Sequence, residues 1–115
     1  MSATLSVYIM TPDLEGLRRF YEAGLGARAG ERSGNWVPFE LAGATFALHA
    51  AQPDGEEGLQ QVSYGFGVGD VDAALARFEG AGAKVLRGVA DESYGRKATL
   101  EDPDGRVFEI VQYEL

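Results

Sequence analysis

The two halves of this 115-residue sequence match each other in order, and this internal repeat is the feature that most constrains the fold. A shift of 57 residues places Asp13 on Asp70, and a shift of 62 residues places Phe46 on Phe108. The offset changes between the helix and the last strand of each half, where loops absorb insertions. The other matched pairs include Leu5 with Val62, Ser6 with Ser63, Ile9 with Phe66, Tyr21 with Phe78, Gly43 with Gly105, and Ala47 with Glu109. We therefore expect two copies of one small unit, packed together within one chain or between chains.

In each half, the pattern predicts a strand, a helix and then three strands. Alternating apolar residues predict a strand at 3–10, and Asp13 is placed to cap the helix that follows it. A glycine at position 24 or 26 ends that helix. The three strands predicted after it cover 27–32, 35–41 and 44–49, with the tight turn Ala42-Gly43 between the last two.

A polar, glycine-rich linker at about 51–59 separates the halves, and the pattern then restarts. A strand is predicted at 60–68, and Asp70 caps a helix that Gly80 or Gly82 ends. The later strands are predicted at 84–87, 96–101 and 107–112, with the loop 88–95, which contains Tyr94, acting as a flap over one end of the sheet. The expected organisation is one domain built of two βαβββ units, at about 3–50 and 60–113.

Composition excludes several classes of protein. The net charge is −8 and the ten basic residues are scattered, which argues against binding to nucleic acid. The same acidic charge would favour a cationic ligand, although solubility alone also explains it. The chain has no cysteine, so disulfides and thiolate metal sites are excluded. No apolar run approaches the ~18 residues of a membrane span and no signal peptide is recognised, so we expect a cytoplasmic protein without a membrane partner.

One carboxylate near the C-terminus stands in an apolar setting. The turn at 102–105 leads into a strand on which Glu109 lies between Val107 and Val111 on one face. An ionised group among apolar neighbours needs a partner or a task. Two interpretations follow: Glu109 pairs with a cation of a neighbouring strand, or it serves a functional site.

The helices are expected to cover one face of the strands, so the opposite faces would line a cleft. The residues expected on that lining are Ser6, Tyr8, Met10, Ala47, His49, Ser63, Gly65, Gly67, Val107, Glu109 and Val111. Either Trp36 or Phe39 would form a wall of the cleft, because the two project to opposite faces of their strand and the sequence does not fix its register.

Several motifs, taken in order, resemble one known group of proteins. They are Phe20-Tyr21, Leu25-Gly26, the run 66–74, the run 80–83, the turn 102–105 and Phe108-Glu109-Ile110. Together they resemble the vicinal-oxygen-chelate superfamily, which includes glyoxalase I, bleomycin-resistance proteins, fosfomycin-resistance proteins and extradiol dioxygenases. The resemblance covers nearly the whole chain. It implies an α+β fold in which two tandem βαβββ units form a curved mixed sheet around a cleft, and a homodimer with units paired within or across chains.

The same resemblance implies where a metal would be held. Metal-using members place ligands at four inward positions, which correspond here to Ser6, Ala47, Ser63 and Glu109. Only Glu109 is a good ligand, because a serine hydroxyl or an alanine methyl does not replace imidazole or carboxylate. The resemblance therefore implies that the metal centre is lost and that no cofactor is used.

We accordingly expect a metal-independent protein that binds and sequesters a small molecule, in the manner of the bleomycin-resistance branch. The candidate ligand-binding residues are Ser6, Tyr8, Met10, Trp36, Phe39, Ala47, His49, Ser63, Tyr94 and Glu109. The rival is a glyoxalase-like lyase or dioxygenase, in which Glu109 and His49 hold a divalent metal or act as an acid–base pair. A third alternative is an interaction module whose cleft is filled. Whether the protein is an enzyme stays open at this stage.

Overall fold

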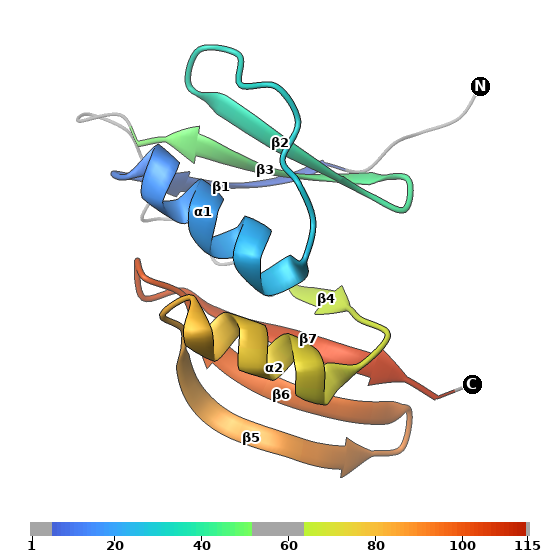
Figure 1. Ribbon diagram of the computed structural model, residues 1–115. Helices are drawn as coiled ribbons and strands as arrows, with labels where there is room; N and C mark the ends of the chain where they lie inside the picture. The colour runs from blue at the N-terminus through green and yellow to red at the C-terminus, as the bar shows by residue number, and fades with distance from the viewer. Residues whose placement is uncertain (1–5, 52–63, 115) are drawn as a thin grey trace. The chain divides into compact units, whose positions relative to one another are not determined.

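The structure, a computed structural model, describes residues 6–51 and 64–114 of the chain. Contacts within the chain divide it into two compact units, residues 1–22 with 27–61 and residues 23–26 with 62–115 (Figure 1). The predicted linker at 51–59 lies almost entirely outside the described residues, as does Ser63.

The first unit is a three-stranded mixed sheet with one helix. Its elements are β1 (Ser6–Thr11), α1 (Leu14–Leu25), β2 (Trp36–Leu41) and β3 (Ala44–Ala50), and the sheet order is β1-β3-β2. β1 runs parallel to β3, and β2 runs antiparallel to it. As the sequence predicts, Asp13 caps α1, since its side chain accepts a hydrogen bond of 2.9 Å from the backbone N–H of Gly16. The turn between β2 and β3 also forms as predicted, with positive φ at both Ala42 and Gly43.

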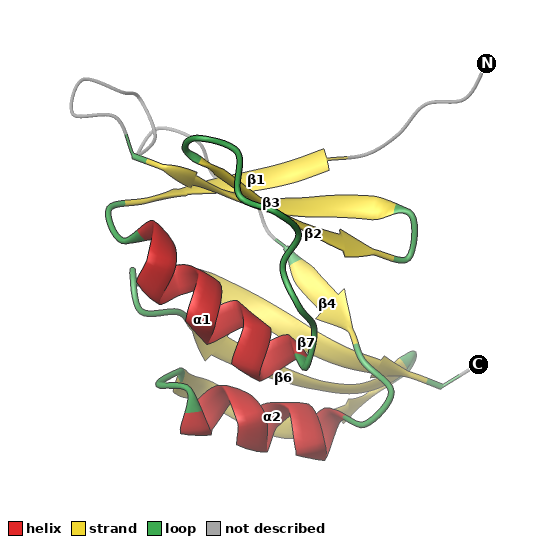
Figure 2. Ribbon diagram, turned by 45° about the horizontal axis from the view of Figure 1, so that its top comes forward, coloured by secondary structure: helices red, strands yellow, loops and turns green. Residues whose placement is uncertain are grey.

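The core of the first unit lies between α1 and one face of the sheet. Tyr21 of α1 packs edge-on against Phe46 of β3, with ring centroids 5.1 Å apart. The side chains buried in this layer come from the apolar stripe of the helix and from alternate strand positions: Ile9, Leu14, Leu17, Phe20, Val37, Phe39 and Leu48. Among the described residues of this unit, α1 is the one helix, and it lies on one face of the sheet (Figure 2).

The second unit has a longer, four-stranded sheet and one helix. Its elements are β4 (Gly65–Gly67), α2 (Val71–Gly80), β5 (Lys84–Glu92), β6 (Gly95–Glu101) and β7 (Val107–Tyr113), in the sheet order β4-β7-β6-β5. β4 runs parallel to β7, and the other pairs are antiparallel. Asp70 caps α2 by accepting from the N–H of Ala73, and the Gln112 side chain accepts from the N–H of Val71.

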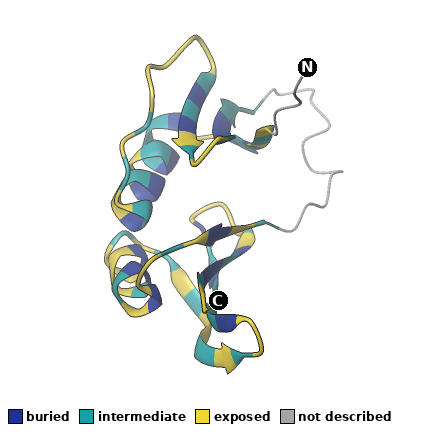
Figure 3. Cartoon of the chain, turned by 90° about the vertical axis from the view of Figure 1, so that its right-hand side faces the viewer, coloured by how far each residue is buried: buried dark blue, intermediate teal, exposed yellow. Residues whose placement is uncertain are grey.

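The helix α2 packs on one face of this second sheet, and buried residues alternate with more exposed ones along β4 and the first part of β7 (Figure 3). Phe78 of α2 contacts Phe108 of β7 with ring centroids 5.1 Å apart. Phe108 and Ile110 are buried on this helix side, as the alternation around Glu109 predicts.

The α+β class and the predicted order of elements are confirmed, with one exception in each unit. The first is the strand predicted at 27–32, which does not form. Gly30 of that segment donates a backbone hydrogen bond of 2.7 Å to the carbonyl of Pro38 on β2, and Ser33, just beyond the segment, forms an isolated bridge with Trp36. Pro38 has no N–H to continue a ladder, and the N–H of Ala29 is bound by the Glu22 carboxylate instead. The sheet therefore ends at β2, and the first unit has one strand fewer than the predicted βαβββ.

The second exception is the predicted flap at 88–95. These residues continue β5 as far as Glu92 and turn at Ser93 and Tyr94 directly into β6. The register of β5 shifts between Val85 and Arg87 and again between Arg87 and Ala90. Such bulges interrupt the alternation of apolar and polar residues, so the strand's pattern is broken where the backbone is still paired.

Both units open with a strand that pairs in parallel with the unit's last strand, with a helix between them. This shared order is what the internal repeat leads one to expect. The duplication itself stays a prediction.

Candidate functional site

Five of the sequence-predicted site residues lie together on the face of the first sheet that points away from α1. The strand register sets Tyr8 opposite Ala47, and sets His49 between Met10 and Trp36. Because side chains alternate along a strand, all five project to one face, on which Ala47 is fully buried, and the layer packed against α1 lies on the other. The structure thus brings together Tyr8, Met10, Trp36, Ala47 and His49 as the sequence predicts.

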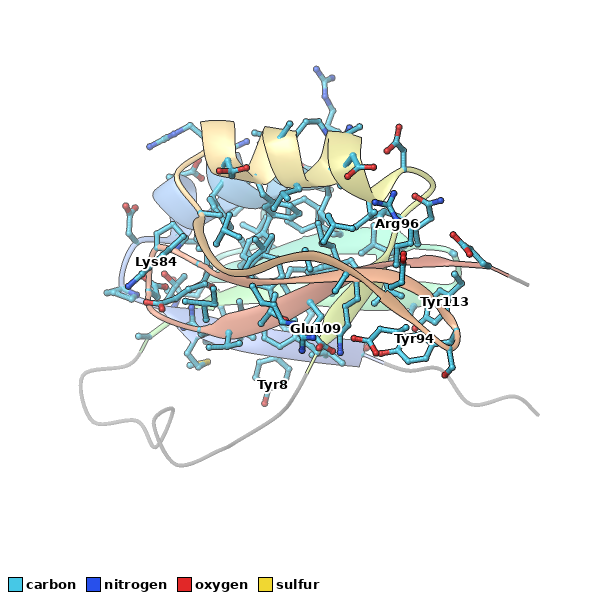
Figure 4. All side chains as sticks on the ribbon, turned by 90° about the horizontal axis from the view of Figure 1, so that it is seen from below. Tyr8, Lys84, Tyr94, Arg96, Glu109 and Tyr113 are labelled. Carbon is cyan, nitrogen blue, oxygen red and sulfur yellow. The ribbon has the colours of Figure 1, made fainter. Side chains whose placement is uncertain are left out.

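Three of these residues form a cluster of rings, which we call the aromatic face: Tyr8, Trp36 and His49. The ring centroids are 5.7 Å apart for Tyr8 and Trp36, 6.3 Å for Tyr8 and His49, and 6.4 Å for Trp36 and His49. These separations are those of interacting aromatic pairs. Tyr8 nevertheless keeps 55% of its surface exposed, and Figure 4 shows it on the side of its sheet away from α1.

His49 is held in one tautomer when it is neutral. Its Nδ1 lies 2.7 Å from the carbonyl oxygen of Ala50. A carbonyl oxygen only accepts, so Nδ1 carries the proton and the lone pair of the neutral ring is on Nε2. The aromatic face therefore includes one hydrogen-bond acceptor with a defined direction.

The register decides between Trp36 and Phe39, and Phe39 is withdrawn from the candidate site. Phe39 is fully buried on the α1 side, with its ring centroid 6.1 Å from that of Phe46. The two alternatives differ by one residue in register, and a one-residue change moves every side chain of a strand to the opposite face.

The second unit also has a face that points away from its helix, and Glu109 lies on it. The register places Gly65, Glu109 and Thr99 in one row across three strands, and Gly67, Val111 and Lys97 in the next. Glu109 and Lys97 are therefore diagonal neighbours on adjacent strands.

Glu109 is paired with a cation. Lys97 Nζ lies 3.0 Å from Glu109 Oε2, with the Lys97 side chain 19% exposed and the Glu109 side chain 42% exposed. The hydrogen bond to Glu109, followed by one to Tyr94, raises the pKa of Lys97 above its ordinary value. Of the two interpretations of Glu109, the structure confirms a cation on a neighbouring strand. Sequence analysis missed Lys97, although the alternation along 96–101 places it on the same face as Thr99.

Two tyrosines flank this ion pair. Tyr94, in the turn between β5 and β6, has its ring centroid 6.1 Å from that of Tyr113 on β7 and 6.0 Å from Lys97 Nζ. Tyr94 is 41% exposed and Tyr113 is 58% exposed. Figure 4 shows Glu109 and Tyr94 on the side of the sheet opposite to α2, whereas Arg96 points to the helix side, where it binds Asp72 at 2.8 Å. Tyr94 is thus part of a hairpin turn and not of a flap, and Tyr113 is a second residue that sequence analysis missed.

A comparison with known protein families shows which family the chain belongs to. The model of the Glyoxalase/Bleomycin resistance protein/Dioxygenase superfamily matches residues 4–110. The chain belongs to this superfamily. A search of curated proteins finds no match to the sequence.

Solved structures with the same fold are described with different roles. A superfamily enzyme from Burkholderia phytofirmans PsJN has a TM-score of 0.80 at 22% identity, covering 97% of this chain and 100% of that one. A protein described as oxidase ChaP-H2 has a TM-score of 0.80 at 22% identity, covering 98% and 94%. TnmS3 from Streptomyces sp. CB03234, described as an antibiotic binding protein, has a TM-score of 0.73 at 26% identity, covering 99% and 98%.

The positions that correspond to metal ligands in metal-using members of the superfamily do not form a donor set here. Ser6 is exposed, Ala47 offers a methyl group, and Glu109 is bound to Lys97. Ser63 lies outside the described residues. Within the part of the chain that the structure describes, no three His, Cys, Asp or Glu residues come together as a metal site would require. Among the described residues, the side chains at these positions therefore do not fit a catalytic divalent metal.

Within the described ranges, neither α1 nor α2 is long and apolar enough to span a bilayer.

Proposed function

We propose that this protein binds and sequesters a small aromatic molecule without a metal ion, and that the aromatic face of the first unit makes the contact. The observation that carries the proposal is the cluster of Tyr8, Trp36 and His49, contributed by three adjacent strands, with Tyr8 55% exposed. An exposed tyrosine ring beside two half-buried rings on one sheet face favours a partner that covers them.

The chemistry of the cluster indicates the kind of ligand. Tyr and Trp present large rigid surfaces, and ring pairs contribute about 0.5–1.5 kcal/mol beyond the area they bury. Met10, beside His49 in the register, adds an adaptable side chain that fits ligands of irregular shape. The lone pair of His49 Nε2 would accept a hydrogen bond from a ligand O–H or N–H group. A flat ligand with one such donor therefore suits this face best.

The expected preference for a cationic ligand has no local support at Glu109. Lys97 already neutralises that carboxylate at 3.0 Å. The net charge of −8 still attracts cations at long range, but salt screens this attraction beyond about 8–10 Å. Stacking and the His49 acceptor, and not charge, are what we expect to determine the choice of ligand.

Comparison with solved structures supports a binding role without fixing the ligand. TnmS3, which is 26% identical in sequence, is described as an antibiotic binding protein. The fold alone also carries enzymes, as the oxidase ChaP-H2 shows. Sequestration of a toxic aromatic compound, a homodimeric state and a cytoplasmic location are parts of this proposal.

A pair of tyrosine substitutions tests the aromatic face. Trp36 is the only tryptophan, so its single indole N–H signal in an NMR spectrum reports on this face alone. A panel of flat aromatic compounds is screened for shifts of that signal, and the affinity of each hit is measured by titrating the same signal, so that binding elsewhere on the chain does not contribute. We expect Tyr8→Leu to weaken binding by about tenfold, in line with the loss of one stacking contact.

The matched control is Tyr113→Leu, because Tyr113 is a similarly exposed tyrosine of the second unit, 58% exposed against 55% for Tyr8. We expect it to leave the affinity of compounds that shift the Trp36 signal unchanged. If no compound shifts the Trp36 signal, or if Tyr8→Leu and Tyr113→Leu weaken binding equally, the aromatic face is not the binding site.

A further inference from the structure

The outer edge of the second sheet is the strand β5, and among the described residues this strand pairs with β6 alone (Figure 1). Its nine residues make it the longest of the described strands. The backbone N–H and C=O groups on its outer side face no strand of the described chain. An edge of this kind is a surface to which a further strand can add through backbone hydrogen bonds.

Charges of opposite sign lie at the two ends of this strand. Lys84 and Arg87 lie in its first half, and both are exposed. Asp91 and Glu92 lie at its end. Asp91 has the Arg96 guanidinium 3.5 Å away. In contrast, none of the ion pairs among the described residues involves Lys84, Arg87 or Glu92. These three charges are therefore available to a partner.

The distribution of charge along β5 decides what kind of partner fits. Lysines and bulges on an edge strand act against association, and β5 has both, since its register shifts on each side of Arg87. An edge that carried only cations would repel a second copy of itself. This edge is cationic at one end and acidic at the other. Two copies aligned antiparallel would therefore meet with opposite charges facing each other.

The residues of β5 are self-complementary in this alignment. Antiparallel pairing about Gly88, the middle of the strand, sets Lys84 of one copy opposite Glu92 of the other, and two-fold symmetry repeats the pair. Both side chains lie on the face of the sheet opposite to α2, as their register partners on β6 show. Leu86, which is 44% exposed, falls opposite Ala90 of the second copy. A Cβ at Gly88 would meet nothing within 4 Å, so the crossing point of the two strands is open.

We propose that two copies of this chain associate through the outer edge of β5, as an antiparallel strand pair with ion pairs between Lys84 and Glu92 across the copies. Each copy has a net charge of −8, so two copies repel each other unless cations lie where they meet, and β5 supplies such cations. This inference rests on the homodimeric state proposed above and names the surface that forms it. Ligand binding by the aromatic face is not needed for it.

Exchange of the two charges tests the strand pair. Lys84→Glu and Glu92→Lys each place like charges opposite each other twice, and each should weaken self-association by about tenfold or more in sedimentation equilibrium. The double variant Lys84→Glu/Glu92→Lys should restore it. Within one chain the two residues are about 26 Å apart, because a strand rises about 3.3 Å per residue. Rescue by the double variant is therefore possible only between copies.

Mixing gives a second readout from the same variants. An equimolar mixture of Lys84→Glu and Glu92→Lys should form a mixed dimer, because each variant carries the charge that the other one lacks. Hydrogen exchange of the wild type needs no substitution, and the outer N–H groups of β5 should become protected as the protein concentration rises. The matched control is Arg19→Glu on α1, an exposed arginine whose reversal changes the net charge by the same amount as Lys84→Glu. It should leave self-association unchanged.

Three results would overturn the β5 interface. A dimer that neither single variant weakens would contradict this surface and leave the homodimeric state standing. Equal weakening by Arg19→Glu and Lys84→Glu would attribute the effect to net charge and not to β5. A wild type that stays monomeric at every concentration would contradict both the interface and the homodimeric state. Ligand binding at the aromatic face is read separately from the Trp36 signal, so none of these results decides it.

Discussion

At the scale of single residues, the environment of Glu109 shows how an apolar setting is made compatible with a charge. Val107 and Val111 flank it along β7, and Lys97 of β6 supplies the opposite charge across the sheet. A half-buried carboxylate in this position is stabilised by a charge-assisted hydrogen bond. The residue is therefore first a structural partner of Lys97, and any ligand must compete with or join that pair.

The pKa of Lys97 tests this pairing. Its ordinary value is 10.5, and the hydrogen bond to Glu109, followed by that to Tyr94, raises it in the folded protein. We expect Glu109→Gln to lower the pKa of Lys97, and Tyr94→Phe to lower it by less. The measurement is an NMR titration of the lysine side-chain signals. An unchanged Lys97 pKa in Glu109→Gln would mean that the two side chains do not interact in solution.

The same shift predicts how stability depends on pH. Because the pKa of Lys97 is higher in the folded than in the unfolded chain, its stabilising effect is fully present below the unfolded value of 10.5 and is lost as the pH rises through the folded value. The stability advantage of the wild type over Glu109→Gln should therefore decrease only when the pH rises above 10.5.

Sequence reasoning at this scale identifies faces but not partners. Alternation along 107–111 correctly places Phe108 and Ile110 in the core and Glu109 on the opposite face. It does not say which residue of which strand lies beside Glu109, because that depends on the pairing register of β6 and β7. Lys97 was missed for this reason, and Phe39 was included for the same reason.

At the scale of elements, the hairpin of β5 and β6 depends on a single glycine at its turn. Gly95 has φ of +148°, and a Cβ at this position would lie 2.1 Å from the carbonyl oxygen of Gln112 on β7. A side chain here would meet both backbone strain and a steric clash. The neighbouring strand could accommodate it only by moving its backbone.

Substitution of two glycines in this hairpin tests that requirement. We expect Gly95→Ala to lower the free energy of unfolding by at least about 2 kcal/mol, from strain and overpacking together. Gly88→Ala is the matched control, because Gly88 lies on β5 with an ordinary φ and open space around its Cβ position. It should change stability by less than about 0.5 kcal/mol. Urea denaturation measures both, and equal effects would contradict the hairpin geometry.

The hairpin also shows which elements the sequence predicts well. The helices, the turn at Ala42-Gly43 and the strands with regular alternation are confirmed, because local propensity and hydrophobic period agree there. The strand at 27–32 was wrong because its neighbour Pro38 lacks a donor, and the flap at 88–95 was wrong because bulges hide a paired strand. Both errors concern pairing between segments, which the local pattern does not encode.

At the scale of the whole molecule, membership of the superfamily establishes the fold and leaves the chemistry to the side chains. The family model covers residues 4–110, so the scaffold of the superfamily is present almost in full. On that scaffold, the ligand positions hold Ser6, Ala47 and a Glu109 that is bound to Lys97. Because this fold accommodates both enzymes and binding proteins, the function of the chain has to be assigned from the donor groups of its side chains.

The metal content of the purified protein tests that assignment. Because a catalytic site normally requires three protein ligands, we expect protein purified without chelator to carry well under one equivalent of nickel, zinc, manganese or iron per chain, measured by mass spectrometry of the elements. Ligands that shift the Trp36 signal should bind with equal affinity in the presence and absence of EDTA. Glu109→Gln provides the decisive comparison: a stoichiometric metal in the wild type that disappears in this variant would establish a metal centre at Glu109. Lys97 would then have to release the Glu109 carboxylate to the ion. With a metal centre present, the protein would have to be considered as a lyase or dioxygenase.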